Sequence, residues 1–400
     1  MSALERAYRD ERAAVLATIT RRLDGDLALA EDVVQDAFLA AAVDWDRRGV
    51  PDRPGAWLTT TAWRRALDRR RRDRVADAHV ADLAQPMSYD ANLDFERSSL
   101  EDDQLAMLFT CSHPALAPEA RIALTLRSVA GLTVPEIARA FLSSEDAMER
   151  RLTRARRKVT DAVIPFCVPP DERLPERLSG VLRVIYLVYT EGHGGVRGDI
   201  CEEAIRLARL LARLMPDEPE VLGLLALLLV TDARKAARVR DDGMLVSLDE
   251  QDRSRWDAGR IAEGAGMLER ALRLGRSGPY VVQAAIAALH SEAPTWEATD
   301  WPQIAGLYAE LARVDPSPVV MINRAVAVAF ATGAQAGLAI LDELQGDPRL
   351  DRYQPLHAAR AELLRRAGDA DAADAAYATA IALADSDAQR TALERRRDRG

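Results

Sequence analysis

The stretch GLTVPEIARAFLSSEDAMERRLTRARRK, residues 131–158, predicts two helices joined by a tight turn. Thr133 and Glu136 have the three-residue spacing of a capping box, and Pro135 lies in the first helical turn, where a missing N–H costs no hydrogen bond. The first helix should end at Leu142-Ser143-Ser144, and either serine can cap the helix that follows.

The second helix carries apolar and cationic side chains on different faces. An apolar stripe recurs at positions i, i+4, i+7 and i+11, which are Met148, Leu152, Ala155 and Val159. The other faces carry Arg150, Arg151, Arg154, Arg156, Arg157 and Lys158. A short helix, a turn and a cationic second helix form the helix-turn-helix pattern, whose second helix enters a DNA major groove. The same pattern fits a helical hairpin with a solvated arginine face, so the rest of the chain has to decide.

The composition is that of a globular chain with sizeable cores. The chain has 400 residues, of which 48% are hydrophobic and 29% charged, and this length suggests about two to four domains. No uninterrupted apolar run approaches the roughly 18 residues of a membrane span, and the N-terminus lacks the apolar core of a signal peptide. We therefore expect a cytoplasmic protein without a membrane partner.

Positive charge is clustered in two segments, although the chain is acidic overall. The formal net charge is −9, yet residues 64–74 contain seven arginines and residues 150–158 form a second basic block. Local basic patches on an acidic chain favour selective DNA contact over indiscriminate nucleic-acid binding.

Catalytic and metal-binding patterns are weak throughout the chain. Cys111, Cys167 and Cys201 are isolated from one another, and Cys111-Ser112-His113 lacks a second pair of zinc ligands. We expect neither an enzyme nor a bound metal or cofactor.

Helical periodicity dominates the chain, which predicts an all-α fold. Four prolines within residues 165–175 suggest a domain boundary. Beyond it, Gly333 and Gly368 mark equivalent turns 35 residues apart, close to the tetratricopeptide period of about 34. A small hairpin over residues 239–248, turning at Asp242-Gly243, is the one expected exception.

Three motifs in a fixed order resemble a bacterial RNA polymerase sigma factor of the extracytoplasmic-function type. They are AEDVVQDAFLAAA (30–42), WLTTTAWRRALDRRRR (57–72) and the stretch 131–158. The C-terminal half, with IYLVYTEGHGG (185–195) and TDARKAARVRDDG (231–243), is similar to the long extension of one subgroup, whose end is tetratricopeptide-like.

The resemblance implies four segments. Residues 1–75 would bind core polymerase and the −10 promoter element, and residues 76–99 would be a linker. Residues 100–166 would carry the helix-turn-helix for the −35 element, and residues 167–400 would form a helical extension.

The resemblance also implies three sets of contact residues. The acidic helix would bind core polymerase, with Val34 and Phe38 contributing where exposed, through Glu31, Asp32, Gln35 and Asp36. The second motif would open and hold the −10 element through stacking and charge, using Trp63, Arg64, Arg65, Arg69, Arg71 and Arg72. The recognition helix would read the −35 element through Glu149, Arg150, Thr153, Arg154 and Arg157.

Two rival interpretations stay open on the sequence. A stand-alone helix-turn-helix regulator with a sensor domain would bind duplex DNA without polymerase, and a repeat-based adaptor would show no DNA binding. For the sigma interpretation, our hypothesis is that the extension regulates, docking on the sigma half or on the polymerase.

Overall fold

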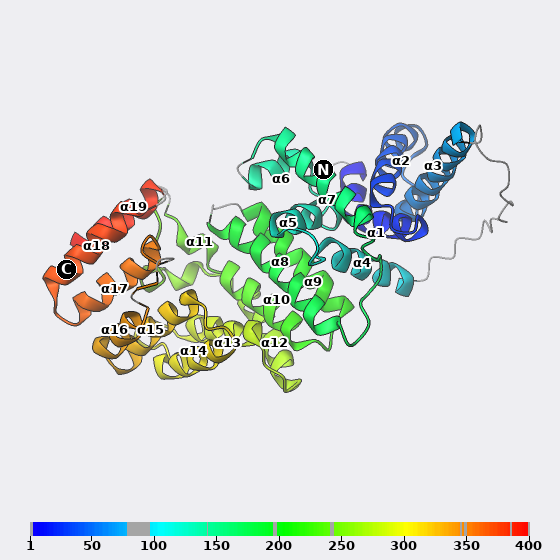
Figure 1. Cartoon of the computed structure of the whole chain (residues 1–400). Helices are drawn as coiled ribbons and strands as arrows, with labels where there is room; N and C mark the ends of the chain where they lie inside the picture. The colour runs from blue at the N-terminus through cyan, green and yellow to red at the C-terminus, as the bar shows by residue number, and fades with distance from the viewer. Residues whose placement is uncertain are drawn as a thin grey trace. The chain divides into compact units, whose positions relative to one another are not determined.

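The computed structural model describes residues 3–77, 97–141, 143–194, 198–240, 244–344, 346–347, 350–384 and 386–398. The chain divides into two compact units, residues 1–214 and residues 215–400. Throughout the described ranges, the regular structure is helical apart from one isolated antiparallel bridge, so the predicted all-α fold is confirmed (Figure 1).

The first unit contains nine α-helices among its described residues. They are α1 (Ala3–Arg22), α2 (Leu27–Arg48), α3 (Pro54–Asp77), α4 (Arg97–Cys111), α5 (Pro118–Ser128), α6 (Val134–Ala140), α7 (Glu145–Asp161), α8 (Leu174–Gly194) and α9 (Gly198–Leu214). Most of the expected linker, residues 78–96, lies outside the described residues, and its two ends continue α3 and α4.

Helices α1, α2 and α3 pack on one another, with α2 and α3 side by side (Figure 1). Asp26 caps α2 by accepting a hydrogen bond from the Leu29 backbone N–H at 3.0 Å. One face of α2 is buried at the spacing of an amphipathic helix, through Ala30, Val33, Val34, Ala37, Phe38, Ala41 and Trp45. The opposite face is therefore free to make contacts outside this helical group.

The helix-turn-helix forms as the sequence predicts. Thr133 and Glu136 make the reciprocal bonds of a capping box, with the Thr133 N–H 2.7 Å from a Glu136 carboxylate oxygen. Of the two candidate serines, Ser144 caps α7 by accepting from the Ala147 N–H at 3.3 Å. The predicted stripe is buried in α7 as Met148, Leu152, Ala155 and Val159.

The expected boundary at residue 166/167 does not match the division into compact units. Helices α8 and α9 pack against α4 and α5, so they belong to the first unit. Arg177 on α8 donates to the Phe109 carbonyl at 2.6 Å, and Arg206 on α9 donates to the Ala130 carbonyl at 2.9 Å. The proline-rich segment is therefore a connection within one folded unit, and the division falls between Leu214 and Met215.

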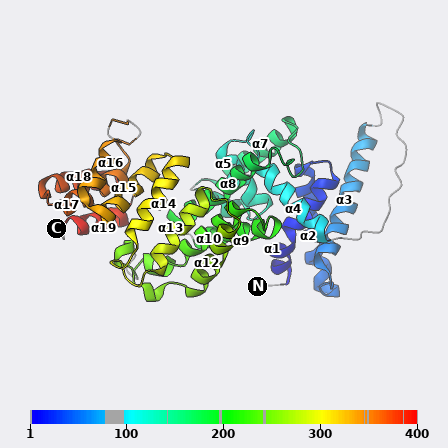
Figure 2. The same cartoon turned by 90° about the horizontal axis from the view of Figure 1, so that it is seen from below.

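The second unit is a row of helices in which each member packs on the next from α12 to α19 (Figure 2). Its α-helices are α10 (Pro219–Asp232), α11 (Lys235–Arg238), α12 (Ala258–Arg273), α13 (Pro279–Glu292), α14 (Trp301–Val314), α15 (Pro318–Thr332), α16 (Ala334–Asp342), α17 (Gln354–Arg366), α18 (Ala370–Ala382) and α19 (Asp387–Asp398). Two short 3₁₀ helices cover Leu248–Glu250 and Arg253–Arg255.

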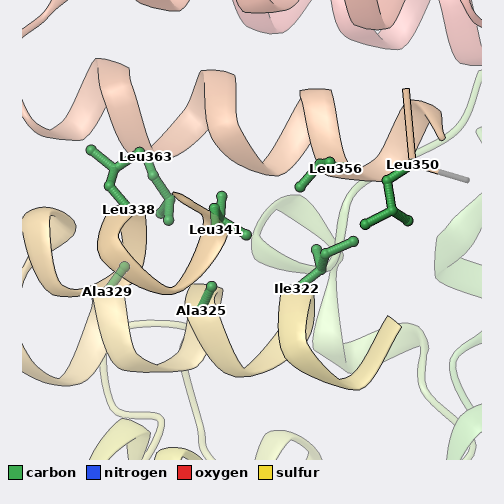
Figure 3. Close-up of a cluster of buried hydrophobic side chains, with 8 residues drawn as sticks. All are labelled: Ile322, Ala325, Ala329, Leu338, Leu341, Leu350, Leu356 and Leu363. Carbon is green, nitrogen blue, oxygen red and sulfur yellow. The ribbon is translucent and has the colours of Figure 1, made fainter. Parts of the chain in front are cut away.

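Two helix pairs, α15/α16 and α17/α18, form the predicted repeat. Gly333 and Gly368 occupy the turns with φ of +123° and +84°, a region that favours glycine. A buried leucine cluster joins α15, α16 and α17, in which Leu341 and Leu363 are fully buried (Figure 3). A methyl group added at Gly337 would lie 2.5 Å from the Ala325 carbonyl oxygen, so α16 can approach α15 closely only with glycine there.

The expected hairpin is present only as the bridge between Val239 and Leu245. Its turn at Asp242-Gly243 lies outside the described residues. The last helix returns to this region, since Arg396 on α19 pairs with Asp249 at 3.1 Å. The end of the row is thereby joined to a segment near its beginning.

Candidate functional site

The exposed face of α2 combines acids with apolar side chains. Asp32 and Gln35 are exposed and Asp36 is half-buried, while Leu39 and Val43 expose 62% and 57% of their surface. These five positions follow i, i+3, i+4, i+7 and i+11, so they form one continuous stripe along the helix. An acidic stripe that ends in exposed apolar side chains is suited to protein contact.

Val34 and Phe38 do not meet the condition of exposure under which the sequence predicted that they contribute to this face. Val34 and Phe38 expose only 1% and 7% of their surface because they pack in the core of the α1–α3 group. Leu39 and Val43 are the exposed apolar residues instead. The helical spacing from Asp32 could have identified both, since it places them on the solvent side.

Glu31 does not lie on the exposed face with its acidic neighbours. Its side chain is 6% exposed, and a carboxylate oxygen lies 3.0 Å from Nε of Arg156 on the recognition helix α7. Ser128 at the end of α5 donates its hydroxyl to the other oxygen at 3.1 Å. One residue step rotates a helical side chain by about 100°, which turns Glu31 inward while Asp32 faces solvent. Glu31 is therefore buried in the free protein, and its contact with polymerase stays a prediction.

The arginines of α3 face the acids of α2. Arg65 lies 3.7 Å from Asp36, and Arg69 lies 3.1 Å from Asp32. These pairs are well exposed, so each stabilises the fold by no more than about 1 kcal/mol. A surface cavity of about 370 Å³ opens along this face, lined by Asp36, Thr61, Arg64, Arg65, Asp68, Arg69 and Arg72.

The remaining predicted arginines of α3 are at the surface. Arg64 and Arg71 are exposed and have no ion pair among the described residues. Arg72 is also exposed and donates to the Asp68 carbonyl at 3.3 Å. Arg64, Arg65, Arg69 and Arg72 thus line one surface cavity together with Asp36 and Asp68, whereas Arg71 is not among its lining residues.

The two tryptophans of this motif have different surroundings. Trp57 is half-buried and packs edge-on against the buried Trp45, with ring centroids 5.6 Å apart. Trp63 is half-buried, and the Arg22 guanidinium lies 5.5 Å from its ring centroid. Burial, and next the charge of Arg21, lowers the pKa of Arg22. Trp63 therefore keeps part of its surface accessible beside a cation.

The recognition helix α7 exposes the predicted −35 residues. Arg150, Thr153, Arg154 and Arg157 are all exposed at i, i+3, i+4 and i+7, with Glu149 beside them. Arg157 forms an exposed pair with Asp161 at 3.3 Å.

Two other arginines of α7 make contacts inside the protein. The Arg151 guanidinium lies 5.5 Å from the Phe141 ring centroid, which stabilises the helix-turn-helix from within. Arg156 is 18% exposed and faces Glu31. Arg156 also lies 3.8 Å from the exposed Glu149, so it connects Glu31 to the edge of the exposed stripe of α7.

Neither a metal-binding cluster nor a membrane-spanning helix occurs among the described residues. Cys111 is fully buried, and this burial strongly raises the pKa of its thiol, with a smaller contribution from Glu31. The described ranges hold no group of three or more His, Cys, Asp or Glu residues that could bind a metal ion. Among those same residues, no helix combines the length and apolarity needed to cross a membrane.

Three family models match consecutive parts of the chain. Sigma-70 region 2 matches residues 8–75 and Sigma-70 region 4 matches residues 107–159. A family of unknown function, DUF6596, matches residues 177–272. The two sigma matches contain the exposed faces of α2, α3 and α7.

Comparison with individual proteins agrees with these matches. The uncharacterized protein R00370 of Rhizobium meliloti is 45% identical over 374 residues, covering 90% of this chain and 87% of the relative. The probable ECF RNA polymerase sigma factor SigI of Mycobacterium tuberculosis is 30% identical over 178 residues, covering 42% of this chain and 58% of that protein. The ECF RNA polymerase sigma factor SigL of the same species is 48% identical over 71 residues, covering 18% of this chain and 40% of its own length.

The chain is a sigma factor of the extracytoplasmic-function type. It carries a long C-terminal extension, and the DUF6596 match spans the division between the two units of this sigma factor. The first two helices of the extension, α8 and α9, are therefore structurally part of the sigma half, whereas α10 begins the separate second unit.

Proposed function

We propose that this sigma factor directs core RNA polymerase to specific promoters, using three separate surfaces on α2, α3 and α7. The main support is the exposed stripe of α2, in which Asp32, Gln35 and Asp36 continue into exposed Leu39 and Val43. Members of the sigma-70 family are non-enzymatic initiation factors, so each surface has to supply binding energy.

Core polymerase is the proposed partner of the α2 stripe. The carboxylates would attract a basic surface during approach, which mainly raises the association rate. Leu39 and Val43 would then lose their remaining water contact, which adds affinity that salt does not screen. Because salt screens the carboxylates but not the apolar contact, the complex with polymerase should weaken at high salt and still form.

The arginines of α3 are proposed to hold the opened −10 element. Arg65 and Arg69 are paired with acids in the free protein, but exposed pairs of this kind are weak and can exchange for phosphate. Arg64, Arg71 and Arg72 add charge along the same helix. Trp63 is the aromatic residue best placed to stack on an unpaired base, because Trp57 is already packed against Trp45.

The exposed stripe of α7 is proposed to read the −35 element. Arginine can bind guanine through two hydrogen bonds or grip phosphate, and Arg150 and Arg154 have no competing ion pair among the described residues. Thr153 lies between them, and Glu149 could accept from a cytosine amino group. The ion pair between Arg157 and Asp161 would have to break before Arg157 contacts DNA.

The extension is proposed to regulate the sigma half. Support comes from α8 and α9, which contact region 4 through Arg177 and Arg206. Arg206 binds carbonyl groups at the end of α5, directly before the helix-turn-helix, so a movement of α9 would act on the DNA-reading domain.

Truncation can test this regulatory role. The chain should be ended after Leu214, where the first unit ends, and not after Pro170, which would expose the faces of α4 and α5 that α8 and α9 cover. A regulatory role predicts altered promoter-dependent transcription by residues 1–214. Equal transcription by the truncated and full chains, in vitro and in cells, would contradict it.

Reconstitution with core polymerase tests the sigma role itself. Promoter-specific open complexes, detected by the reactivity of unpaired thymines, are expected only when both proteins are present. Tight duplex binding without polymerase would instead support the stand-alone regulator, although that function leaves the exposed Leu39 and Val43 without a use. Failure to form open complexes on a range of promoters would reject the proposal.

A further inference from the structure

Two adjoining cavities lie between the last helix of the second unit and a segment near its beginning. Their volumes are about 240 Å³ and 230 Å³, and Glu250 and Arg395 are among the residues that line both. We call these two cavities the arginine pocket, because both segments contribute arginines to the lining, namely Arg238, Arg240, Arg395 and Arg396. The proposed promoter contacts use none of these four arginines.

Backbone pairing fixes the first wall of the arginine pocket. The Val246 N–H donates to the Arg238 carbonyl at 2.8 Å, and the Arg240 N–H donates to the Met244 carbonyl at 2.9 Å. Side chains two positions apart in an extended segment point to the same side. This pairing therefore holds Arg238 and Arg240 on one side of the segment.

Helix α19 supplies the second wall. Leu393 is 6% exposed and anchors the helix, while the Gln389 side chain donates to the Gln354 side chain on α17 at 3.0 Å. Arg396 reaches the other wall by pairing with Asp249 at 3.1 Å. These contacts place the arginines of α19 opposite those of the first wall.

The arginine pocket carries more positive than negative charge. Glu250 lines it and Asp249 pairs with Arg396, and these two carboxylates offset only half of the charge of the four guanidinium groups. Arg240 and Arg395 are both exposed and form no ion pair among the described residues. Like charges around one cavity repel each other, so an anion bound between them stabilises this arrangement.

A buried hydroxyl group also points to a ligand. The Ser247 Oγ atom is buried on the lining of the larger cavity, and it has no hydrogen-bond partner among the described residues. A buried polar group without a partner costs free energy. An oxyanion can accept hydrogen bonds from this hydroxyl and from guanidinium groups at the same time.

The chemistry and size of the arginine pocket favour a small phosphorylated ligand. Arginine binds phosphate oxygens through two parallel hydrogen bonds, so a phosphate group suits several guanidinium groups around one cavity. Each cavity is smaller than the roughly 300 Å³ at which pockets for drug-sized ligands begin. Leu245, Val246 and Leu393 offer apolar surface to a small organic part of the ligand. A DNA duplex is too wide to enter cavities of this size.

We propose that the arginine pocket binds a small phosphorylated molecule, either a phosphate ester or a diphosphate, which joins α19 to residues 238–250. Binding itself is independent of the proposed sigma function. Its consequence for transcription rests on the proposed regulation by the extension, because the ligand is then a signal that acts through the second unit.

Isothermal titration calorimetry of the full-length protein with sodium pyrophosphate tests the proposal. The titration is made in chloride at constant ionic strength and without polymerase. A single pyrophosphate should bind per chain, and inorganic phosphate should bind more weakly because it offers fewer oxygens. Bound pyrophosphate should also slow hydrogen exchange of the α19 amides, since it joins this helix to the opposite wall.

Arg395→Gln is the main test variant, because Arg395 lines both cavities and its replacement breaks no ion pair among the described residues. Loss of one charge-assisted hydrogen bond should raise the Kd for pyrophosphate by about tenfold or more. Arg240→Gln should have a similar effect, and Ser247→Ala should raise the Kd by about threefold. Arg390→Gln removes the same charge from α19 outside the pocket, where Arg390 forms an exposed pair with Asp387, and should leave the Kd unchanged.

Four outcomes would overturn the proposal. The first is no saturable binding of pyrophosphate by the wild type, or binding that both Arg395→Gln and Arg240→Gln leave unchanged. The second is equal weakening by Arg390→Gln, which would mean that pyrophosphate only neutralises surface charge. The third is citrate binding as tight as that of pyrophosphate, which would assign the pocket to carboxylates. The fourth is binding seen only after Asp241 and Asp242, which lie outside the described residues, are changed to asparagine, because the chain's own carboxylates would then be the ligand.

Formation of open complexes with core polymerase tests the sigma function separately. Normal pyrophosphate binding without open complexes on any promoter would reject the sigma function and retain the ligand site. Open complexes without pyrophosphate binding would retain the sigma function and reject the ligand site.

Discussion

Replacing Leu39 and Val43 by alanine removes the apolar part of the α2 stripe without disturbing the core of region 2. The two side chains expose 62% and 57% of their surface in the free protein. Fully burying a side chain of this kind contributes about 1.5–3 kcal/mol, so the exposed fractions can contribute on the order of 1–1.5 kcal/mol each. The double variant should lose about 2–3 kcal/mol of binding, which is roughly a 30- to 150-fold rise in Kd.

Fluorescence anisotropy of labelled sigma factor titrated with core polymerase measures this Kd. Circular dichroism and an unchanged urea midpoint would show that the variant is folded. Leu272→Ala, which alters a leucine of similar exposure (50%) on α12, is the control and should bind polymerase like the wild type. A rise of less than threefold in the double variant would refute the assignment of the α2 stripe to polymerase.

Three further predictions concern α7, its C-terminal end and the second unit. Arg154→Ala should reduce transcription from a −35-dependent promoter by about tenfold, since one good base or phosphate contact is worth about 1–3 kcal/mol. Core-polymerase affinity should stay unchanged, and its loss would argue against a DNA contact. Val163→Gly should raise the free energy of unfolding by about 1 kcal/mol in urea titrations. Val163 lies just after α7 with a φ of +48°, a conformation that favours glycine. A lower free energy of unfolding in the variant would contradict this. Burial, followed by the charges of Arg234 and Arg253, lowers the pKa of His290 from 6.5 to about 4. The unfolded imidazole takes up a proton below about pH 6.5 while the folded one does not, so about 3 kcal/mol present above that pH should be lost as the pH falls to 4. His290→Gln should flatten this pH dependence, and an equal slope in both proteins would disprove the assignment.

The sequence predicted the local structure of region 4 well because that structure depends on neighbouring residues. The capping box at Thr133 and Glu136, the cap of α7 and its buried stripe all follow from spacings of three to eleven residues. The turns at Gly333 and Gly368 were predictable for the same reason.

Residues whose surroundings come from distant parts of the chain were not predictable in this way. Helical spacing places Glu31 on the inner face of α2 with the buried Val34 and Phe38, but its partners Ser128 and Arg156 come from distant helices and were not predictable. The packing of α8 on the first unit beyond the prolines was not predictable, because the carbonyl that Arg177 contacts belongs to Phe109, 68 residues earlier. Leu39 and Val43 could have been predicted, because helical spacing from Asp32 places both on the solvent side of α2.

The pairing of Arg396 with Asp249 limits how the second unit can evolve. Open helical arrays lengthen readily, because a duplicated repeat only adds another layer to a free end. Here the final helix is fixed to a segment 147 residues earlier. A duplication of the 35-residue unit between α15 and α18 would carry Arg396 away from that partner. Natural variants of this extension should therefore differ by substitutions and loop changes more readily than by the number of repeats.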